Sequence, residues 1–317
     1  MTTPQAPLPS GFSATSTAKQ VLGNKRLDGV TAIVTGGYAG IGLETTRVLA
    51  EAGAKVIVPA RTPEKARAAV GKMPNVELEE LDLANPASID AFAARFLQSG
   101  RALQLLINNA GIMATPFEKD ARGFESQFAT NHLGHFQLTA RLWPALKKAN
   151  GARVVSLSSR GHARSPVVFD DPFFEKRAYD KWLSYGQAKT ANVLFAVGLD
   201  ARGQKYGVRA FAVHPGGIIT DLVRSLSEEE KSTLLTNIQK STVLKTIEEG
   251  AATTVWAATS SQLDGKGGVY CENADVAELV ANDPTIGKGV RAYAIDPAQA
   301  DLLWTKSEGW TGVRFEF

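Results

Sequence analysis

The feature that most constrains this chain is a glycine run placed directly after an apolar strand. Residues 30–34 form a continuous apolar and β-branched stretch, which is typical of a strand buried on both faces of a parallel sheet. The run comprises Thr35, Gly36, Gly37, Tyr38, Ala39, Gly40, Ile41 and Gly42, and helical apolar spacing follows it up to Gly53. Bare backbone at a strand-to-helix turn can approach a phosphate closely, and the helix N-terminus favours an anion. We therefore expect the pyrophosphate of a dinucleotide here, although an ordinary turn also needs glycines.

Six further strand-like stretches alternate with helical patterns after the glycine run. The predicted strands are 55–58, 76–81, 103–107, 154–158, 208–213 and 268–271, and a long helical region is expected over 124–149. Strands separated by helices of this length are joined by right-handed crossovers, which gives a parallel sheet covered on both faces. We predict one α/β domain over 28–317, a doubly wound sheet of about seven strands, preceded by a partly disordered extension rich in Thr, Ser and Pro over 1–27.

Composition excludes several classes of function. The net charge of +3 over 317 residues is mild and scattered, which argues against nucleic acid as a partner. Cys271 is the only cysteine, and His132, His135, His162 and His214 have no metal-ligand spacing, so no metal site is expected. We expect His162 in a surface loop, and His132 and His135 to pack or face water on their helix. No apolar stretch of about 18 residues is present, so the expected location is the cytoplasm.

Arg61 follows the second predicted strand, at a tip that lies beside the adenosine ribose in doubly wound dinucleotide folds. A carboxylate at this tip grips the 2′-hydroxyl of NAD, whereas an arginine accommodates the 2′-phosphate of NADP. The carboxylate is missing and a guanidinium matches phosphate geometry, so the sequence favours NADP over NAD. Asp82, at the tip of the third strand, is placed to accept from the adenine amino group. The alternatives are a solvated loop arginine and a simple turn aspartate.

Tyr185 and Lys189 stand four positions apart in a helical region, so their side chains share one face. A free phenol titrates near pH 10, but at ~4 Å and an effective dielectric of ~20 an ammonium favours the phenolate by roughly 4 kcal/mol. After desolvation we expect the pKa of Tyr185 to fall by about one or two pH units. Such a phenol can serve as general acid to a carbonyl oxygen that gains negative charge. Taken alone, the pair would equally suit an exposed helix surface.

Motifs in family order over residues 28–275 make the chain resemble the short-chain dehydrogenase/reductase family. Besides the glycine run, these motifs are Asp82-Leu83, Asn108-Asn109-Ala110-Gly111, Asn131, Ser158-Ser159, Tyr185-Gly186-Gln187-Ala188-Lys189, Pro215-Gly216 and Thr220. The long segment between Ser159 and Tyr185 and the tail after Cys271 are similar to the retinol-dehydrogenase-like branch and depart from the compact members. The resemblance implies a Rossmann fold and a nicotinamide cofactor.

The same resemblance implies roles for individual residues. Ser159 is expected to donate to the substrate oxygen, Lys189 to hold the nicotinamide ribose hydroxyls, and Asn131 to tie Lys189 to solvent through a water relay. Thr220 is expected to contact the carboxamide or pyrophosphate region. A buried structural amide is the alternative for Asn131. The implied cofactor-binding set is completed by Leu83, Asn109, Ala110, Gly111, Tyr185, Lys189, Pro215, Gly216 and Ile218.

Segment 217–245 is expected to be a lid over the substrate, and 275–317 a C-terminal tail. Within the lid, Ser227 and Glu230 form a capping-box signature that starts a helix carrying apolar residues. An ordinary surface helix is the alternative. The remaining apolar wall is expected from Ile112, Met113, Phe169, Phe173, Phe174 and Trp182. This wall predicts a lipophilic substrate.

The sequence therefore predicts an NADP(H)-dependent oxidoreductase that interconverts a lipophilic ketone or aldehyde and its alcohol, with Tyr185 as general acid/base. A sugar-nucleotide epimerase or dehydratase is an alternative, although its glycines are spaced differently and it needs a larger C-terminal domain. A non-catalytic dinucleotide-binding regulator is another, although such proteins usually lose a member of the Ser-Tyr-Lys set. Pairing into a homodimer or homotetramer through 124–149 and 185–205 is expected unless the 160–182 excursion and the tail cover that surface.

Overall fold

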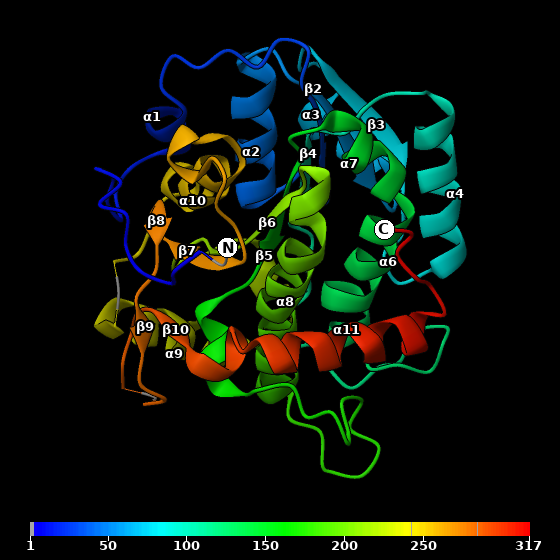
Figure 1. The fold of residues 1–317 in the computed structure, drawn as a ribbon. Helices are drawn as coiled ribbons and strands as arrows, with labels where there is room; N and C mark the ends of the chain where they lie inside the picture. The colour runs from blue at the N-terminus through cyan, green and yellow to red at the C-terminus, as the bar shows by residue number, and fades with distance from the viewer. Residues whose placement is uncertain (1–2, 242, 284) are drawn as a thin grey trace.

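The computed structural model describes residues 3–241, 243–283 and 285–317, and over these residues its main sheet has eight strands in the order β3-β2-β1-β4-β5-β6-β7-β8 (Figure 1). The strands are β1 Thr31–Val34, β2 Lys55–Ala60, β3 Val76–Glu80, β4 Leu105–Asn108, β5 Arg153–Leu157, β6 Arg209–His214, β7 Val269–Glu272 and β8 Asp275–Val276. The first seven run parallel and β8 is antiparallel to β7. The predicted doubly wound parallel sheet is confirmed, and the two-residue β8 is too short for its pattern to have been recognised.

Helices cover both faces of the sheet. They are α1 Ala18–Leu22, α2 Gly40–Glu51, α3 Pro63–Val70, α4 Pro86–Gln98, α5 Ser126–Phe128, α6 Gly134–Arg141, α7 Trp143–Ala149, α8 Lys181–Gly203, α9 Glu228–Ser241, α10 Ile247–Thr259 and α11 Pro297–Thr311. One apolar core packs α1, α2 and α10 on one face, and a second packs α4, α6, α7, α8 and α11 on the other. Short 3₁₀ turns lie at Arg160–Arg164, Gln204–Tyr206, Asp221–Ser225, Ser261–Leu263 and Ala292–Ala294.

The strand order reverses between β1 and β4, and this reversal fixes where a ligand can bind. Chain crossovers leave β1 toward β2 on one side and reach β4 on the other, so the loops after these strands diverge and leave a crevice at their carboxyl ends. Val34 and Ile107 are register partners at this end. The glycine run therefore begins beside the segment that follows β4.

The helical region expected over 124–149 is broken into pieces. A π-helical turn, Ala129–Leu133, joins α5 to α6, and α7 starts separately after Leu142. Pro144 lies in the first turn of α7, where its missing N–H costs nothing, whereas it could not continue α6. The π turn contains Asn131, and such turns are frequent at functional sites.

Residues 3–27 follow a defined path along the sheet edge, which differs from the partly disordered extension expected over 1–27. The Gln5 amide donates to the carbonyls of Tyr270 and Ala277 at 2.8 and 2.7 Å. The Asp275 carboxylate accepts from the amides of Leu8 and Ser10 at 2.8 and 3.1 Å. Polar side chains thus pair the extension with strands far away in sequence, which composition alone does not reveal.

The segment expected as a C-terminal tail, 275–317, is mostly structured. It contains a small parallel pair, β9 Leu279–Val280 and β10 Val290–Arg291, and then α11, which crosses α8 (Figure 1). Trp304 of α11 stacks on Phe195 of α8 at 6.0 Å between ring centroids. Part of the α8 surface is therefore covered by the chain itself.

Asp275→Ala should loosen the N-terminal extension, because the carboxylate accepts from two backbone amides of the extension as well as from the Val276 amide. We expect faster hydrogen exchange at Leu8 and Ser10 and a loss of about 1 kcal/mol in unfolding free energy. Glu278→Ala is the matched control, since that carboxylate pairs with exposed Lys288 instead. Unchanged exchange in Asp275→Ala would show that the extension is held by other contacts.

Candidate active site

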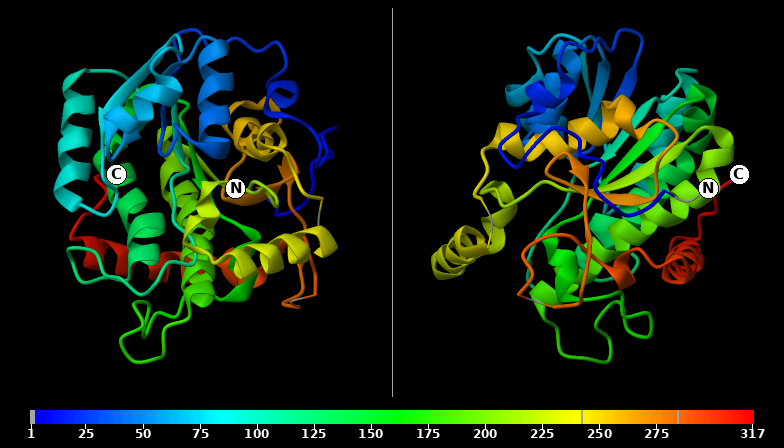
Figure 2. Two further views of the ribbon diagram at one scale, coloured as in Figure 1. Left: turned by 180° about the vertical axis from the view of Figure 1, so that it is seen from behind. Right: turned by 60° about the vertical axis from the view of Figure 1, so that its left-hand side comes forward.

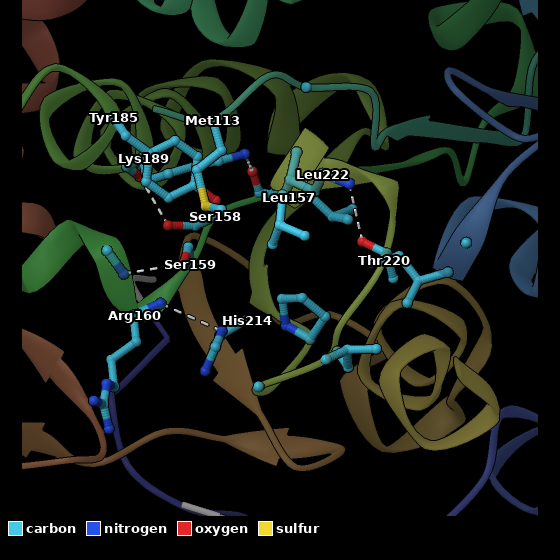
Figure 3. Close-up of a pocket in the computed structure, with 18 of the residues that line it drawn as sticks. Met113, Leu157, Ser158, Ser159, Arg160, Tyr185, Lys189, His214, Thr220 and Leu222 are labelled. Carbon is cyan, nitrogen blue, oxygen red and sulfur yellow. Dashed lines mark hydrogen bonds between the residues drawn. The ribbon is translucent and has the colours of Figure 1, made fainter. Parts of the chain in front are cut away.

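A cavity of about 850 Å³ opens at the carboxyl ends of β1, β4, β5 and β6 (Figure 3). Its lining includes most of the predicted cofactor set, namely Gly36, Tyr38, Gly40, Ile41, Gly42, Asn109, Ala110, Gly111, Tyr185, Lys189, Pro215, Gly216, Ile218 and Thr220. Ser159 lines the same cavity. Segments spread over nearly 200 residues are thus brought together at the crevice that the strand order creates.

The glycine run closes tightly on the segment after β4. A Cβ atom at Gly42 would lie 2.4 Å from the Gly36 carbonyl oxygen, and Gly36 itself has φ of +65°. The Thr35 hydroxyl accepts from the amides of Asn109 and Ala110 at 2.9 and 3.0 Å. Larger residues would therefore force the two segments apart.

The start of α2 suits an anion such as a dinucleotide pyrophosphate. Its N-cap residue, Ala39, provides no side-chain hydrogen bond to the first helical amides, and Gly40, Ile41 and Gly42 line the cavity. Uncapped amides at a helix N-terminus are donors aimed at the ligand, and the helix dipole favours negative charge. The residues present therefore fit the cofactor that the sequence predicts.

Tyr185 and Lys189 lie one turn apart on α8, on the face turned toward the cavity (Figure 3). The Lys189 Nζ donates to the Leu157 carbonyl at 3.0 Å and lies 5.5 Å from the centre of the Tyr185 ring. Ser159, two residues after the end of β5, lines the same cavity as Tyr185. The structure thus assembles Ser159, Tyr185 and Lys189 in one place, as predicted.

The expected lowering of the Tyr185 pKa is wrong for the protein without ligand. Burial raises the pKa of Tyr185 to about 12, although its hydrogen bond with Ser159 opposes this. Burial also lowers the pKa of Lys189 to about 8. The prediction placed the ammonium near the phenol oxygen, whereas the ammonium donates to the Leu157 carbonyl. Desolvation therefore outweighs attraction, and both groups shift toward their neutral forms.

Asn131 lies beside this group without lining the cavity. Its side-chain amide forms two hydrogen bonds of 2.9 Å with Ile112, one to the backbone N–H and one to the carbonyl. A Cβ atom at Gly111 would lie 3.0 Å from Asn131 Oδ1 and 3.6 Å from Lys189 Nζ, so Gly111 fits between them. The Asn131 side chain is therefore a buried structural amide, which was the alternative expectation. Its part in a water relay stays a prediction.

The turn that carries Ser159 is held by residues that the sequence did not reveal. His162 is fully buried, and its Nδ1 lies 2.8 Å from the Ser159 carbonyl oxygen. Its Nε2 accepts from the Arg291 amide at 3.3 Å, and the Tyr293 hydroxyl donates to its carbonyl at 2.7 Å. The expectation of a surface-loop histidine is wrong because partners 129 and 131 positions away bury it.

Gly161 is a second residue of this turn that the sequence did not single out. A Cβ atom there would lie 2.9 Å from Cε1 of Tyr185 and 3.0 Å from Cδ1. The turn therefore approaches the phenol ring more closely than any side chain would allow. The only sign of this close approach in the sequence is a glycine two positions after the predicted Ser159.

Five predicted cofactor residues lie outside the cavity lining, which are Thr35, Gly37, Arg61, Asp82 and Leu83. Thr35 is buried beneath the glycine loop, and a Cβ atom at Gly37 would lie 2.5 Å from Thr46 Oγ1. Arg61 follows β2 with an exposed side chain. Asp82 accepts from the Ala84 amide at 2.9 Å, which is the turn alternative, and the Leu83 carbonyl packs against Gly134.

The apolar wall of the cavity differs partly from the prediction. Met113 and Trp182 line it, whereas Phe169 and Phe173 pack in a separate cluster. Phe174 lies against the Arg177 guanidinium, 3.9 Å from its ring centre. The remaining lining comes from the segment 217–245 and from the C-terminal region, through Ile218, Leu222, Val223, Leu234, Ile238 and Ile286.

The segment 217–245 folds over the cavity mouth and returns to its starting point. Gly217 and Leu244 form a parallel bridge, and the Lys245 amide donates to the Gly217 carbonyl at 2.9 Å. The predicted capping box is present, with Ser227 and Glu230 exchanging hydrogen bonds of 3.0 and 3.2 Å. Figure 2 shows α9 standing out from the body of the molecule. Glu230 also pairs with Lys181 of α8 at 2.5 Å.

Two absences hold for the described part of the chain. None of its helices has both the length and the apolar character needed to cross a membrane. Within the same residues, no three His, Cys, Asp or Glu side chains are grouped in a way that could hold a metal ion.

A glycine cradle and a Ser-Tyr-Lys group on one cavity define an oxidoreductase that uses a nicotinamide dinucleotide. The chain belongs to the short-chain dehydrogenase family, whose model matches residues 30–231, and to its retinol-dehydrogenase-like branch. A probable oxidoreductase of Streptomyces lividans is 42% identical over 289 residues, covering 88% of this chain and 96% of the relative. Retinol dehydrogenase 12 of Homo sapiens is 38% identical over 304 residues, covering 92% and 90%.

Solved structures agree with this assignment. The crystal structure of an uncharacterized protein from Mycobacterium paratuberculosis has a TM-score of 0.74 and 32% identity to this chain, and the match covers 96% of this chain and all of the other. The fold therefore extends over nearly the whole chain, beyond the region that the family model matches.

Lys189→Met should stabilise the protein near neutral pH, because it removes a buried ammonium. Because the pKa of Lys189 falls to about 8 on folding, the unfolded chain binds more protons above that pH, and the stability of the native protein rises with pH up to about 10.5. We expect the variant to be about 1–3 kcal/mol more stable at about pH 7, with a lead that shrinks above pH 8.

Urea unfolding at about pH 7 and about pH 10 measures this difference. The Leu157 carbonyl keeps the Asn192 amide as a donor at 2.8 Å, so the variant leaves no orphaned acceptor there. Lys65→Met, at an exposed position of α3, is the control and should show little difference at either pH. A destabilised Lys189→Met at neutral pH would mean that the buried ammonium contributes net stability.

Proposed function

We propose that this protein is an NADP(H)-dependent oxidoreductase that interconverts a lipophilic ketone or aldehyde and the corresponding alcohol, with Tyr185 as general acid/base. The observation that supports this most directly is that Ser159, Tyr185 and Lys189 line one cavity together with the glycine run. When bound, the nicotinamide cofactor supplies or accepts the hydride.

The chain's own residues account for the proton and for charge stabilisation. With a pKa of about 12, the Tyr185 phenol is protonated at neutral pH and can donate to a carbonyl oxygen that gains negative charge. Ser159 is a second hydroxyl within reach of the same oxygen. The Lys189 ammonium, charged below about pH 8, adds positive charge on the same helix face.

Arg61 supports NADP over NAD as the cofactor. Its exposed side chain follows β2, which pairs directly with β1, so the carboxyl tips of these strands lie side by side. In doubly wound folds this tip faces the adenosine ribose, where a guanidinium favours a 2′-phosphate. Asp82, which follows β3, already accepts from a backbone amide in its own turn.

The apolar cavity wall supports a lipophilic substrate. Met113 and Trp182 face residues of the 217–245 lid, among them Leu222 and Leu234, across the space near Tyr185. The same cavity is also lined by polar side chains, which are those of Arg160, Arg164, Asp221, Arg224 and Asn237. A mainly apolar pocket with a small number of polar groups is the usual composition for an apolar ligand that is held in one orientation. Retinol dehydrogenase 12, a relative of this chain, carries an apolar substrate in its name.

The assembly and the location remain proposals as well. A homodimer or homotetramer through 124–149 and 185–205 would need a surface of α8 that α11 partly covers, which favours pairing elsewhere on the molecule. Sugar-nucleotide epimerase or regulator activity is separated from the proposed function by assay, because only an oxidoreductase changes the net oxidation state of its cofactor. We retain the cytoplasm as the expected location.

Tyr185→Phe should lower turnover of ketones roughly 100- to 10,000-fold, because it removes the proton donor and little volume. The cofactor dissociation constant should stay within about threefold of wild type, because the ring remains in place. Tyr206→Phe is the control, since Tyr206 packs against Trp143 and Phe317 away from the cavity. Activity close to wild type in Tyr185→Phe would remove this residue from the mechanism.

Arg61→Asp should shift the ratio of kcat/KM values from NADPH toward NADH by about 10-fold or more, because it exchanges a phosphate donor for an acceptor of ribose hydroxyls. Arg67→Asp on α3 introduces the same charge change at another exposed position and should leave the ratio nearly unchanged. Equal shifts in both variants, or no shift in either, would exclude Arg61 as the residue that reads the phosphate.

A further inference from the structure

His135 is a buried histidine of α6 with both ring nitrogens engaged. Its Nδ1 lies 3.0 Å from the Asn131 carbonyl oxygen, and its Nε2 lies 2.9 Å from the Thr35 hydroxyl. Its side chain is 2% exposed. It therefore bridges the π turn that carries Asn131 and the first residue of the glycine run, two segments about 100 positions apart. Of the two expectations for His135, packing is confirmed and exposure to water is wrong.

The surrounding atoms favour one protonation state of this ring. A carbonyl oxygen only accepts, so Nδ1 carries the proton. The Thr35 hydroxyl accepts from the amides of Asn109 and Ala110, and its own proton has two acceptors within reach, Nε2 of His135 at 2.9 Å and the Ile107 carbonyl at 3.3 Å. Donation to the nearer Nε2 gives the neutral Nδ1–H tautomer. An imidazolium would set a second N–H against this hydroxyl and restrict the Thr35 proton to the longer bond with the Ile107 carbonyl.

The electrostatic surroundings agree with a neutral ring. Burial lowers the pKa of His135 to about 4, its bond to the Asn131 carbonyl opposes this, and the nearby Lys189 ammonium lowers it further. Neighbouring His132, on the same helical segment, is also buried and neutral at pH 7. Burial and the Lys189 ammonium together outweigh the Asn131 carbonyl, so the imidazole is neutral near pH 7.

We propose that His135, as its neutral Nδ1–H tautomer, is a positioning residue that couples the glycine loop to the Asn131 turn and so to the Lys189 end of the catalytic group. The proposal rests on the proposed function for its kinetic consequences. The coupling runs through few residues. The Thr35 hydroxyl accepts from the amides of Asn109 and Ala110. The next residue, Gly111, fits between Asn131 Oδ1 and Lys189 Nζ.

The coupling predicts that the two bonds of His135 serve different steps. The bond to Thr35 holds the glycine loop and should affect cofactor affinity. The bond to the Asn131 carbonyl holds the π turn beside Lys189 and should affect turnover. A residue that only fills space would show neither effect separately.

His135→Phe keeps the aromatic packing and removes both bonds, so we expect the NADPH dissociation constant to rise roughly 10-fold and kcat to fall roughly 10-fold. In His135→Asn the amide nitrogen takes the place of Nδ1 and can still donate to the Asn131 carbonyl. It should recover kcat to within about threefold of wild type while its NADPH affinity stays weakened. Titration by tryptophan fluorescence and steady-state kinetics give the two quantities.

His132→Phe is the matched control, because His132 is equally buried on the same segment but its Nε2 bonds to Ser307 of α11. It should change neither NADPH affinity nor kcat, whatever it does to thermal stability. Equal losses in His132→Phe and His135→Phe, or parallel losses of affinity and kcat in His135→Asn, would overturn the proposal.

The tautomer is tested without any measurement of turnover. Long-range ¹H–¹⁵N correlation spectra of ¹⁵N-histidine-labelled wild type distinguish the two nitrogens of each of the four rings, with His135→Asn assigning the signals. A neutral ring protonated at Nδ1 is expected for His135 near pH 7. An Nε2–H tautomer or an imidazolium would overturn the proposal even if the enzyme is active, whereas the expected tautomer in a protein that reduces no carbonyl would leave the coupling standing and reject the proposed function.

Discussion

Three hydrogen bonds join helix α8, which carries Tyr185 and Lys189, to the end of β5, and the geometry of the site depends on this junction. The Leu157 carbonyl accepts from Lys189 Nζ at 3.0 Å and from the Asn192 amide at 2.8 Å, while the Ser158 hydroxyl donates to the Lys189 carbonyl at 2.8 Å. Because β5 also delivers the adjacent Ser159, these contacts set the distance between serine and phenol. Orientation of this kind accounts for a large share of enzymatic rate enhancement.

Burying two ionisable groups at this junction has an electrostatic consequence. The pKa of Tyr185 is raised to about 12 and that of Lys189 is lowered to about 8, both by loss of water. The pair is therefore poised to hold its phenolic proton until a ligand changes the local charge. A buried ammonium lowers the free energy of unfolding, which is consistent with the general trade-off between activity and stability at functional sites.

The sequence predicted what local patterns encode and missed what distant contacts decide. The glycine run, the strand periodicity and the Tyr185–Lys189 spacing each lie within a few residues, and the sheet and cavity confirm them. His162 and the N-terminal extension gain their roles from partners more than 100 positions away, so nothing near them in sequence signals burial. The pKa of Tyr185 was mispredicted for a related reason, since periodicity gives the side of a helix and not its depth.

The bridge between Gly217 and Leu244 gives the substrate wall a modular character. Since the stem of this loop is closed by backbone pairing, the free energy of inserting or deleting residues within it grows only slowly with length. Ser159, Tyr185 and Lys189 lie outside the stem and do not depend on the length of what it carries. Exchanging the segment between Gly217 and Leu244 can thus change substrate preference in this scaffold, while Ser159, Tyr185 and Lys189 stay in place.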